Sequence, residues 1–315
     1  MYRRICAELL PTPSKSHYTF NLRDTAKVVQ GMLMVRSNSV TTKQALARLW
    51  VHEASRVFSD RMTNNEDKEY FNGMVTELVG RHLGGVLTHD ELFGEGVHNF
   101  FGDYMTMGAE GNDRVYEEIT DVQKMLKVFD DYLDEHNLSS KSPMNLVFFM
   151  DAAGHIARAA RVLRQPRGNA MMVGVGGSGK QSLTRFAAFM CGQRCAGIEL
   201  RKGYSPADFR EDLKALYLVA GGEGTHLTFL FTDSQIVSEA LLEDIDSMLN
   251  SGEMPGLFAT DELDQLLERR RHAALGEDEG ARRGGALLVG GLLELLRLPL
   301  DAAAALALWH GCRRW

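Results

Sequence analysis

The chain has 315 residues, of which 44% are hydrophobic and 24% charged, a composition typical of a soluble globular protein with about two domains. Its formal net charge of -7, without a basic stripe interleaved with aromatic residues, excludes the nucleic-acid-binding class. One long apolar stretch, residues 285–309, contains two acids, an arginine and a proline and is not expected to span a membrane. We therefore expect neither nucleic acid nor a membrane as a partner.

The four cysteines point to a reducing compartment. Cys6 and Cys312 lie far apart in the sequence, whereas Cys191 and Cys195 are close together. No second pair of histidines or cysteines accompanies them, so the sequence predicts no zinc site. The first residues also lack the apolar core of a signal peptide. These features favour a cytoplasmic protein with free thiols.

Residues 1–140 show helical periodicity, interrupted by one looser segment. Asn21 or Thr19 is expected to cap the first helix, because such side chains accept hydrogen bonds from the first helical turn. Thr41 or Thr42 is expected to cap the second. Apolar residues at helical spacing predict helices over residues 22–33, 42–58, 66–81 and 113–136, with a glycine-rich segment over 84–112.

After a break at residues 139–143, the pattern changes to alternating helices and strands. Helices are predicted over 144–164, after Ser205 and over 234–250, and strands over 170–175, 196–200 and 228–232. Three strands joined by crossover helices predict a parallel sheet covered on both faces. We therefore predict an all-helical domain over residues 1–140, followed by an α/β domain over residues 141–268.

A glycine-rich phosphate loop, residues 174–181, lies between the first predicted strand and a helix. In that context glycines let successive N–H groups point into one concavity, and the helix N-terminus adds partial positive charge there. The alternative is an ordinary glycine-rich turn before a helix. We predict that ATP or ADP binds at Gly174, Val175, Gly176, Gly177, Ser178, Gly179, Lys180, Gln181 and Ser182.

Asp233 follows the third predicted strand and is the natural protein ligand for a nucleotide-bound Mg2+, although it could also cap the next helix. Gln181 follows the loop lysine where a magnesium-binding Ser or Thr is usual, and Ser182 is turned about 100° away on a helix. Ser234 stands where an ATPase would carry its catalytic glutamate, and a serine is no base at neutral pH. We predict nucleotide binding with Mg2+ at Asp233, no catalytic residue and no hydrolysis.

The phosphate loop and its surroundings resemble the fourth AAA+ module of axonemal dynein heavy chains. The glutamine after the lysine and the missing glutamate belong to this resemblance, which covers about residues 1–267. It implies the αβα parallel sheet of P-loop AAA+ proteins, preceded by a helical lid. The segments that carry it are residues 163–170, 174–185, 203–204, 209–214, 229–236, 242–245 and 249–253.

The N-terminal helices resemble the lid that closes the third module in the same family. Residues 10–13, 17–24 and 49–61 carry this similarity. The resemblance implies that a lid arginine serves the nucleotide of its own module. Arg23, Arg56 or Arg61 could be that group, and the alternative for each is a solvated arginine on a helix face.

For the heavy chain as a whole, the resemblance implies a motor that slides along microtubules in a ciliary or flagellar axoneme. The partners of this segment would be the neighbouring AAA+ modules of the ring. Microtubules would be gripped by a coiled-coil stalk outside these residues. Residues 269–315 have low complexity and no counterpart in the family, and we expect a mis-joined or prematurely ended reading frame there.

Two other interpretations belong to different classes of protein. A free-standing P-loop kinase or NTPase would need a substrate-binding acid or a set of lid arginines after the loop. A remnant that binds no nucleotide would lack the last strands of the sheet and would aggregate.

Overall fold

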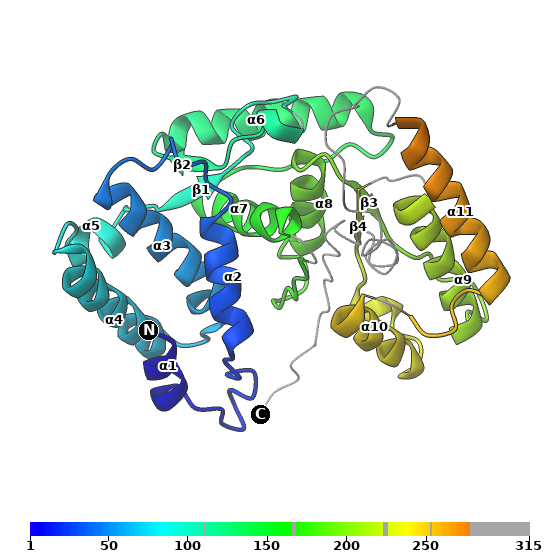
Figure 1. Ribbon diagram of the computed structural model, residues 1–315, viewed down its shortest axis with the longest axis horizontal. Helices are drawn as coiled ribbons and strands as arrows, with labels where there is room; N and C mark the ends of the chain where they lie inside the picture. Colours follow the sequence, from blue (N-terminus) through cyan, green and yellow to red (C-terminus); the bar gives the residue numbers. More distant parts are fainter. Residues whose placement is uncertain (110, 166–167, 223–225, 253, 278–315) are drawn as a thin grey trace. The chain divides into compact units, whose positions relative to one another are not determined.

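The computed structural model describes residues 1–109, 111–165, 168–222, 226–252 and 254–277. Backbone contacts divide the chain into two compact units (Figure 1). Unit 1 comprises residues 1–139 and 146–149, and unit 2 comprises residues 140–145 and the described residues from Met150 onward. Within the described residues, no helix is long and apolar enough to cross a membrane. The apolar stretch 285–309 lies outside them, as does the expected tail beyond residue 277.

Unit 1 is built mainly from helices. Its hydrophobic core brings together Ile5, Val28, Phe58, Phe71 and Val75, which are almost fully buried. Its elements are α1 (Tyr2–Glu8), α2 (Leu22–Met32), α3 (Lys43–Val57), η1 (Ser59–Arg61), α4 (Asn65–Leu83), α5 (His89–Phe93), β1 (Phe100–Gly102), η2 (Gly111–Asp113), β2 (Glu117–Ile119) and α6 (Val122–Ser139).

The helix starts in unit 1 follow the predicted caps. The Asn21 side chain accepts from the backbone of Arg23 and Asp24, and the Asp24 side chain accepts in return from the Asn21 N–H. Thr42 accepts from the N–H of Ala45 and begins α3. These caps confirm the predicted helix starts at Asn21 and Thr42. Such caps can be predicted because their hydrogen bonds involve only residues that are close in the sequence.

The predicted apolar face of α2 is only partly buried. Val28 lies in the core, but Leu22, Val29 and Leu33 are exposed. Helical spacing therefore predicted the helix correctly, while only part of its apolar face is buried.

The helix predicted over residues 113–136 was wrong in its first third. Residues Glu117–Ile119 form β2, which pairs antiparallel with β1, and α6 begins only at Val122. The small sheet forms because Phe101 and Tyr116 pack against Leu49 of α3. Such a long-range contact overrides a local helical pattern.

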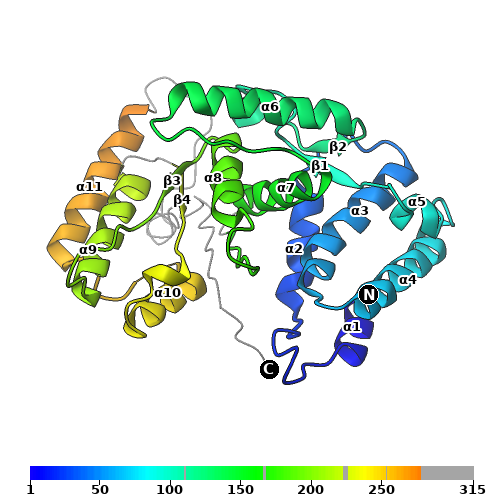
Figure 2. The same ribbon diagram turned by 180° about the vertical axis from the view of Figure 1, so that it is seen from behind.

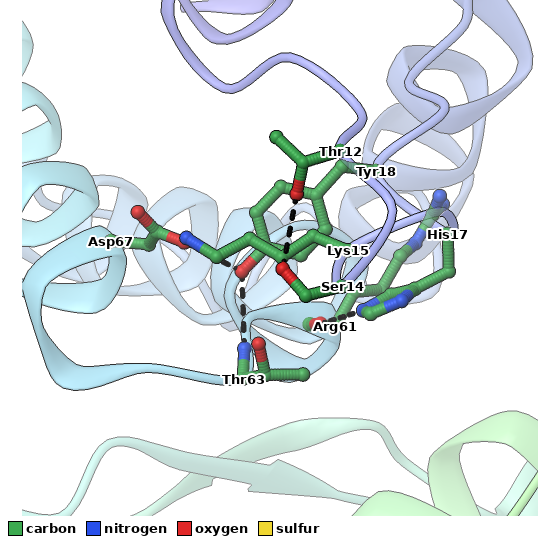
Figure 3. A network of polar contacts seen from close by, with 8 residues as sticks. All are labelled: Thr12, Ser14, Lys15, His17, Tyr18, Arg61, Thr63 and Asp67. Atoms are coloured by element: carbon green, nitrogen blue, oxygen red, sulfur yellow. Dashed lines mark hydrogen bonds and ion pairs between the residues drawn. The ribbon is translucent and has the colours of Figure 1, made fainter. Parts of the chain in front are cut away.

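A polar network fixes the loop between α1 and α2 to the start of α4 (Figure 3). The Asp67 carboxylate accepts from Lys15 Nζ at 2.6 Å and from the Tyr18 hydroxyl at 2.7 Å. The backbone N–H of Thr63 donates to the same hydroxyl at 3.1 Å, and the His17 ring is hydrogen-bonded to the Arg61 carbonyl at 2.9 Å. Asp67 is thus the acceptor on which this part of the loop depends.

Burial alone would raise the pKa of the Asp67 carboxyl, but the hydrogen bonds from Lys15 and Tyr18 outweigh it and hold this pKa below its ordinary value. A lowered folded-state pKa adds stability at pH values above the unfolded value of about 4, and that stability is lost as the pH falls through the folded value. The network should therefore weaken in acid.

Asp67→Asn is expected to lower the free energy of unfolding by about 1.5 kcal/mol at pH 7, because Lys15 loses its charged acceptor. Urea unfolding followed by circular dichroism at pH 7 and at pH 3 measures this difference, which should shrink at pH 3. Glu77→Gln, which removes the exposed partner of Arg4, serves as the control and should have a smaller effect. An equal loss for Asp67→Asn at both pH values would contradict the assignment.

Unit 2 combines helices with a two-stranded parallel sheet. Figures 1 and 2 show α7 beside α8 and α9 beside α11, and Lys214 of α9 pairs with Glu262 of α11 at 2.6 Å. Its elements are α7 (Met150–Arg164), α8 (Lys180–Met190), β3 (Arg194–Ala196), α9 (Pro206–Tyr217), the π-helical turn η3 (Leu218–Gly222), β4 (Leu227–Phe229), η4 (Asp233–Gln235), α10 (Ala240–Ser251) and α11 (Thr260–Glu277).

The predicted three-stranded sheet was wrong in its first strand. Strands β3 and β4 pair in parallel, from Arg194 with Leu227 to Ala196 with Phe229, but residues 170–175 form no strand in the described part of the unit. Met171, Val173 and Val175 are 65%, 63% and 77% exposed. A strand requires a neighbour for its backbone groups, and within the described part of the unit residues 170–175 pair with neither β3 nor β4.

Other boundaries in unit 2 also differ from the prediction. The helix predicted from residue 144 begins at Met150, and the one predicted from residue 234 begins at Ala240 after the short turn η4. The two formed strands start at Arg194 and Leu227 and are shorter than predicted. Residues 269–277 continue α11, so the beginning of the expected tail is helical.

Local signals around α9 and α10 were confirmed. Ser205 accepts from the N–H of Asp208, the Asp208 side chain accepts from the Ser205 N–H, and Pro206 occupies the first helical position. Gly252 ends α10 with a positive φ of 77°. The aromatic core beneath these helices contains Phe209 and Phe231, both fully buried.

Candidate nucleotide-binding site

A cavity of about 450 Å³ lies in unit 2 where the glycine-rich loop meets the end of the β4 segment. This volume is within the range of small-molecule sites. The loop, the first turn of α8 and the turn η4 all contribute to its wall. The lining residues are Met172, Gly176, Gly177, Ser178, Gly179, Lys180, Gln181, Ser182, Thr232, Asp233 and Ser234.

Two glycines give the loop its shape. Gly177 and Gly179 both have a φ of 77°, in the left-handed region that side chains with a Cβ rarely adopt. Gly179 is also the N-cap of α8, so the helix starts at Lys180 with its first N–H groups beside the cavity. These amides and the helix dipole favour an anion at this end of the cavity.

The Lys180 side chain is held by the loop itself. Its Nζ donates to the carbonyl oxygens of Gly174 at 2.8 Å and Val175 at 2.7 Å, and to the Ser178 hydroxyl at 3.0 Å. Gly174 and Val175, which the sequence assigned to the nucleotide, do not line the cavity. Their carbonyl groups position the lysine instead.

A buried threonine connects the loop to the start of α8. Thr184 is fully buried, and its hydroxyl donates to the Lys180 carbonyl at 2.8 Å and contacts the Met172 sulfur at 3.3 Å. The segment before the loop is therefore attached to α8 through Met172. The sequence prediction missed Met172 as a lining residue because it was assigned to a buried strand.

Asp233 belongs to the turn η4 and lines the same cavity as the loop. The alternative that Asp233 caps the next helix was wrong, because α10 starts at Ala240. The N-cap of η4 is Thr232. Among the described residues that line the cavity, Asp233 is the only carboxylate. Glu239 and Glu243, the next acids along the chain, are not part of the wall.

The side chains in the cavity wall suit a nucleotide phosphate better than they suit a metal ion alone. The lysine, the α8 N-terminus and the hydroxyls of Ser178 and Ser182 supply donors for phosphate oxygens. For Mg2+, the wall offers Asp233 with the hydroxyls of Thr232 and Ser234. Thr232 was missed by the sequence prediction, although its position directly after a buried strand and before Asp233 could have indicated it.

The three lid arginines differ in their surroundings. Arg61 is ion-paired with Asp24, and Arg56 pairs with Asp60 at 3.1 Å. Arg23 is exposed at the start of α2. The exposure of Arg23 matches the alternative of a solvated arginine on a helix face, and the assignment of a lid arginine stays a prediction for all three.

Comparison with known proteins agrees with this architecture. A family model described as P-loop containing dynein motor region D4 matches residues 144–283, and one described as AAA+ lid domain matches residues 1–93. Together they confirm the predicted fold class, a P-loop AAA+ α/β domain preceded by a helical lid.

Axonemal dynein heavy chains are similar over most of the chain. Dynein axonemal heavy chain 6 of Homo sapiens is 48% identical over 284 residues, which is 90% of this chain and 7% of that protein. Dynein axonemal heavy chain 1 of Rattus norvegicus is 44% identical over 271 residues, covering 86% of this chain and 6% of that protein.

A flagellar relative matches almost the whole chain. The dynein-1-beta heavy chain of the flagellar inner arm I1 complex of Chlamydomonas reinhardtii is 41% identical over 312 residues, which is 98% of this chain and 7% of that protein. The chain thus spans less than a tenth of the curated relatives that it matches. It belongs to the axonemal dynein heavy-chain family and corresponds to a segment of the AAA+ motor region.

Proposed function

We propose that the cavity between the glycine-rich loop and Asp233 binds ATP or ADP and retains the nucleotide without hydrolysing it. The observation that carries this proposal is that one cavity is lined by Lys180, by the N-terminus of α8 and by Asp233, with no second carboxylate among its described lining residues. Lys180 and the loop amides would hold the phosphates, and Asp233 would hold a Mg2+ ion that neutralises part of their charge.

The same wall explains why hydrolysis is not expected. Attack by water requires a group that orients the water and accepts its proton. Ser234, which follows Asp233, carries only a hydroxyl, and Gln181 replaces the hydroxyl that usually completes the magnesium site. Bound nucleotide would therefore serve a regulatory or structural role, by keeping the loop and the η4 turn in one arrangement.

In the heavy chain, residues 1–140 would act as the lid of one AAA+ module and residues 141–268 as the nucleotide-binding subdomain of the next. Their partners would be the neighbouring modules of a dynein ring. By relation to the axonemal chains, we place the whole protein in a ciliary or flagellar axoneme, where it would move along microtubules. The nucleotide site would modulate that motor activity and would not drive it.

Isothermal titration calorimetry of the purified chain with ATP and with ADP, each with and without Mg2+, tests the proposal. Saturable binding of either nucleotide near one per chain, without phosphate release in a parallel assay, is the expected result. Phosphoryl transfer by the purified chain would instead favour a free-standing kinase or NTPase. Absence of binding in a folded sample would favour a remnant without function at this site.

A further inference from the structure

A glutamine outside the cavity wall bridges the turn that carries Asp233 and the segment that follows β3. The Gln235 Oε1 atom accepts from the backbone N–H of Thr232 at 2.7 Å and from its hydroxyl at 3.1 Å. Its Nε2 atom donates to the carbonyl of Ile198 at 2.6 Å. Both ends of the amide are therefore used, by two segments that lie far apart in the sequence.

This bridge begins where the strand pairing ends. The last backbone hydrogen bond between the two segments is donated by Leu230 to the carbonyl of Ala196 at 2.8 Å. At the next residue, a Cβ on Gly197 would lie only 3.2 Å from the Leu230 carbonyl oxygen and 4.0 Å from Gln235 Nε2. The glycine thus permits a close approach, and the Gln235 amide continues the connection beyond the ladder.

Three residues of the bridged turn line the cavity. Thr232, Asp233 and Ser234 line the cavity, whereas Gln235 does not. The N–H of Gln235 also donates to the Thr232 carbonyl at 2.9 Å, and the Thr232 and Ser234 hydroxyls lie 3.0 Å apart. The turn is therefore closed on itself, and the Nε2 atom of Gln235 connects it to Ile198 in the segment that follows β3.

We propose that Gln235 is a positioning residue of the nucleotide site, which fixes the Asp233 turn opposite the phosphate loop through its bridge between Thr232 and Ile198. This inference rests on the proposed function, because the position of Asp233 matters only if the cavity binds a nucleotide.

A second glutamine in the same unit provides a matched control. Gln193 accepts from the Thr228 hydroxyl at 2.6 Å and donates to the Leu163 carbonyl at 2.9 Å, so it also bridges β4 to another segment. It lies at the opposite end of β4 from the cavity and is buried. Gln193→Leu should therefore cost stability without moving the Asp233 turn.

The test compares Gln235→Leu and Gln193→Leu in the full chain by calorimetric titration with ATP and Mg2+ and by thermal unfolding without nucleotide. Gln235→Leu is expected to raise the Kd for ATP about tenfold or more, since at least two hydrogen bonds that order the turn are lost. Gln193→Leu should leave this Kd within about twofold while lowering Tm at least as much.

A second readout needs no nucleotide. Hydrogen exchange at the Thr232 amide should accelerate in Gln235→Leu and stay as in wild type in Gln193→Leu, because only Gln235 accepts from that N–H. If wild type binds ATP and both variants bind it equally well, the positioning role is wrong and the proposed function stands. If folded wild type binds no nucleotide, the proposed function fails and this inference fails with it.

Discussion

Lys180→Ala is expected to abolish the rise in melting temperature that ATP causes in the wild-type chain. A ligand at about 100 times its Kd stabilises a folded protein by about 2.7 kcal/mol. For a unit of this size, that corresponds to a shift of roughly 5–10 °C. Without the ammonium group, the charge-assisted hydrogen bonds to the phosphates are lost, each of which is worth about 1.5–3 kcal/mol.

Differential scanning fluorimetry with ATP and Mg2+, repeated with ADP, measures this effect. Lys202→Ala is the matched control, because Lys202 is an exposed lysine in the same unit that does not line the cavity. It should keep the full nucleotide-dependent shift. In the absence of nucleotide, Lys180→Ala should melt near the wild-type temperature. The lysine side chain bonds mainly to the backbone carbonyls of Gly174 and Val175, which lie near the surface and can bind water in the variant. An undiminished ATP shift in Lys180→Ala would contradict the assigned role.

Phe231→Ala is expected to destabilise unit 2 by about 3–5 kcal/mol, the cost of removing a fully buried aromatic side chain and leaving a cavity. Phe231 is 0% exposed, and its ring lies 5.7 Å from that of Phe209 and 5.9 Å from that of Phe229. It directly precedes Thr232, so its burial also anchors the segment that carries Asp233. We expect both the unfolding free energy and ATP binding to fall.

Guanidinium unfolding of the wild-type chain and of Phe231→Ala, monitored by circular dichroism, measures the difference in unfolding free energy. Val237→Ala is a suitable control, because that valine belongs to unit 2 and is 47% exposed, so its truncation should change stability by less than about 1 kcal/mol. A loss below about 1 kcal/mol for Phe231→Ala would show that this cluster does not support the site.

Features that depend on neighbouring residues could be predicted from the sequence. Asn21 and Ser205 begin helices because each has an acid three residues later and a hydrogen-bonding side chain of its own. The glycine-rich loop was recognisable for a similar reason, because the positions of its glycines determine the conformation of its backbone. Asp233 and Lys180 do line one cavity, although the first of the two strands expected to bring them together does not form.

Features that depend on distant contacts could not be predicted in this way. Residues 170–175 have the composition of a strand, but forming one requires a pairing partner that composition does not reveal. Residues 117–119 join a sheet because of contacts with α3, about seventy residues earlier in the chain. Gln235 looked like an ordinary helix residue until its bridge to Ile198 was visible, and no sequence pattern signals such a pair.

The measurement that tests the account most directly is the fate of ATP bound to the wild-type chain. The chain is incubated with ATP and Mg2+, separated from free nucleotide and denatured, and the released nucleotide is identified by chromatography. We expect intact ATP at a stoichiometry near one per chain, and none with Lys180→Ala. Recovery of ADP after release of phosphate into solution, or recovery of no nucleotide from folded protein, would contradict it.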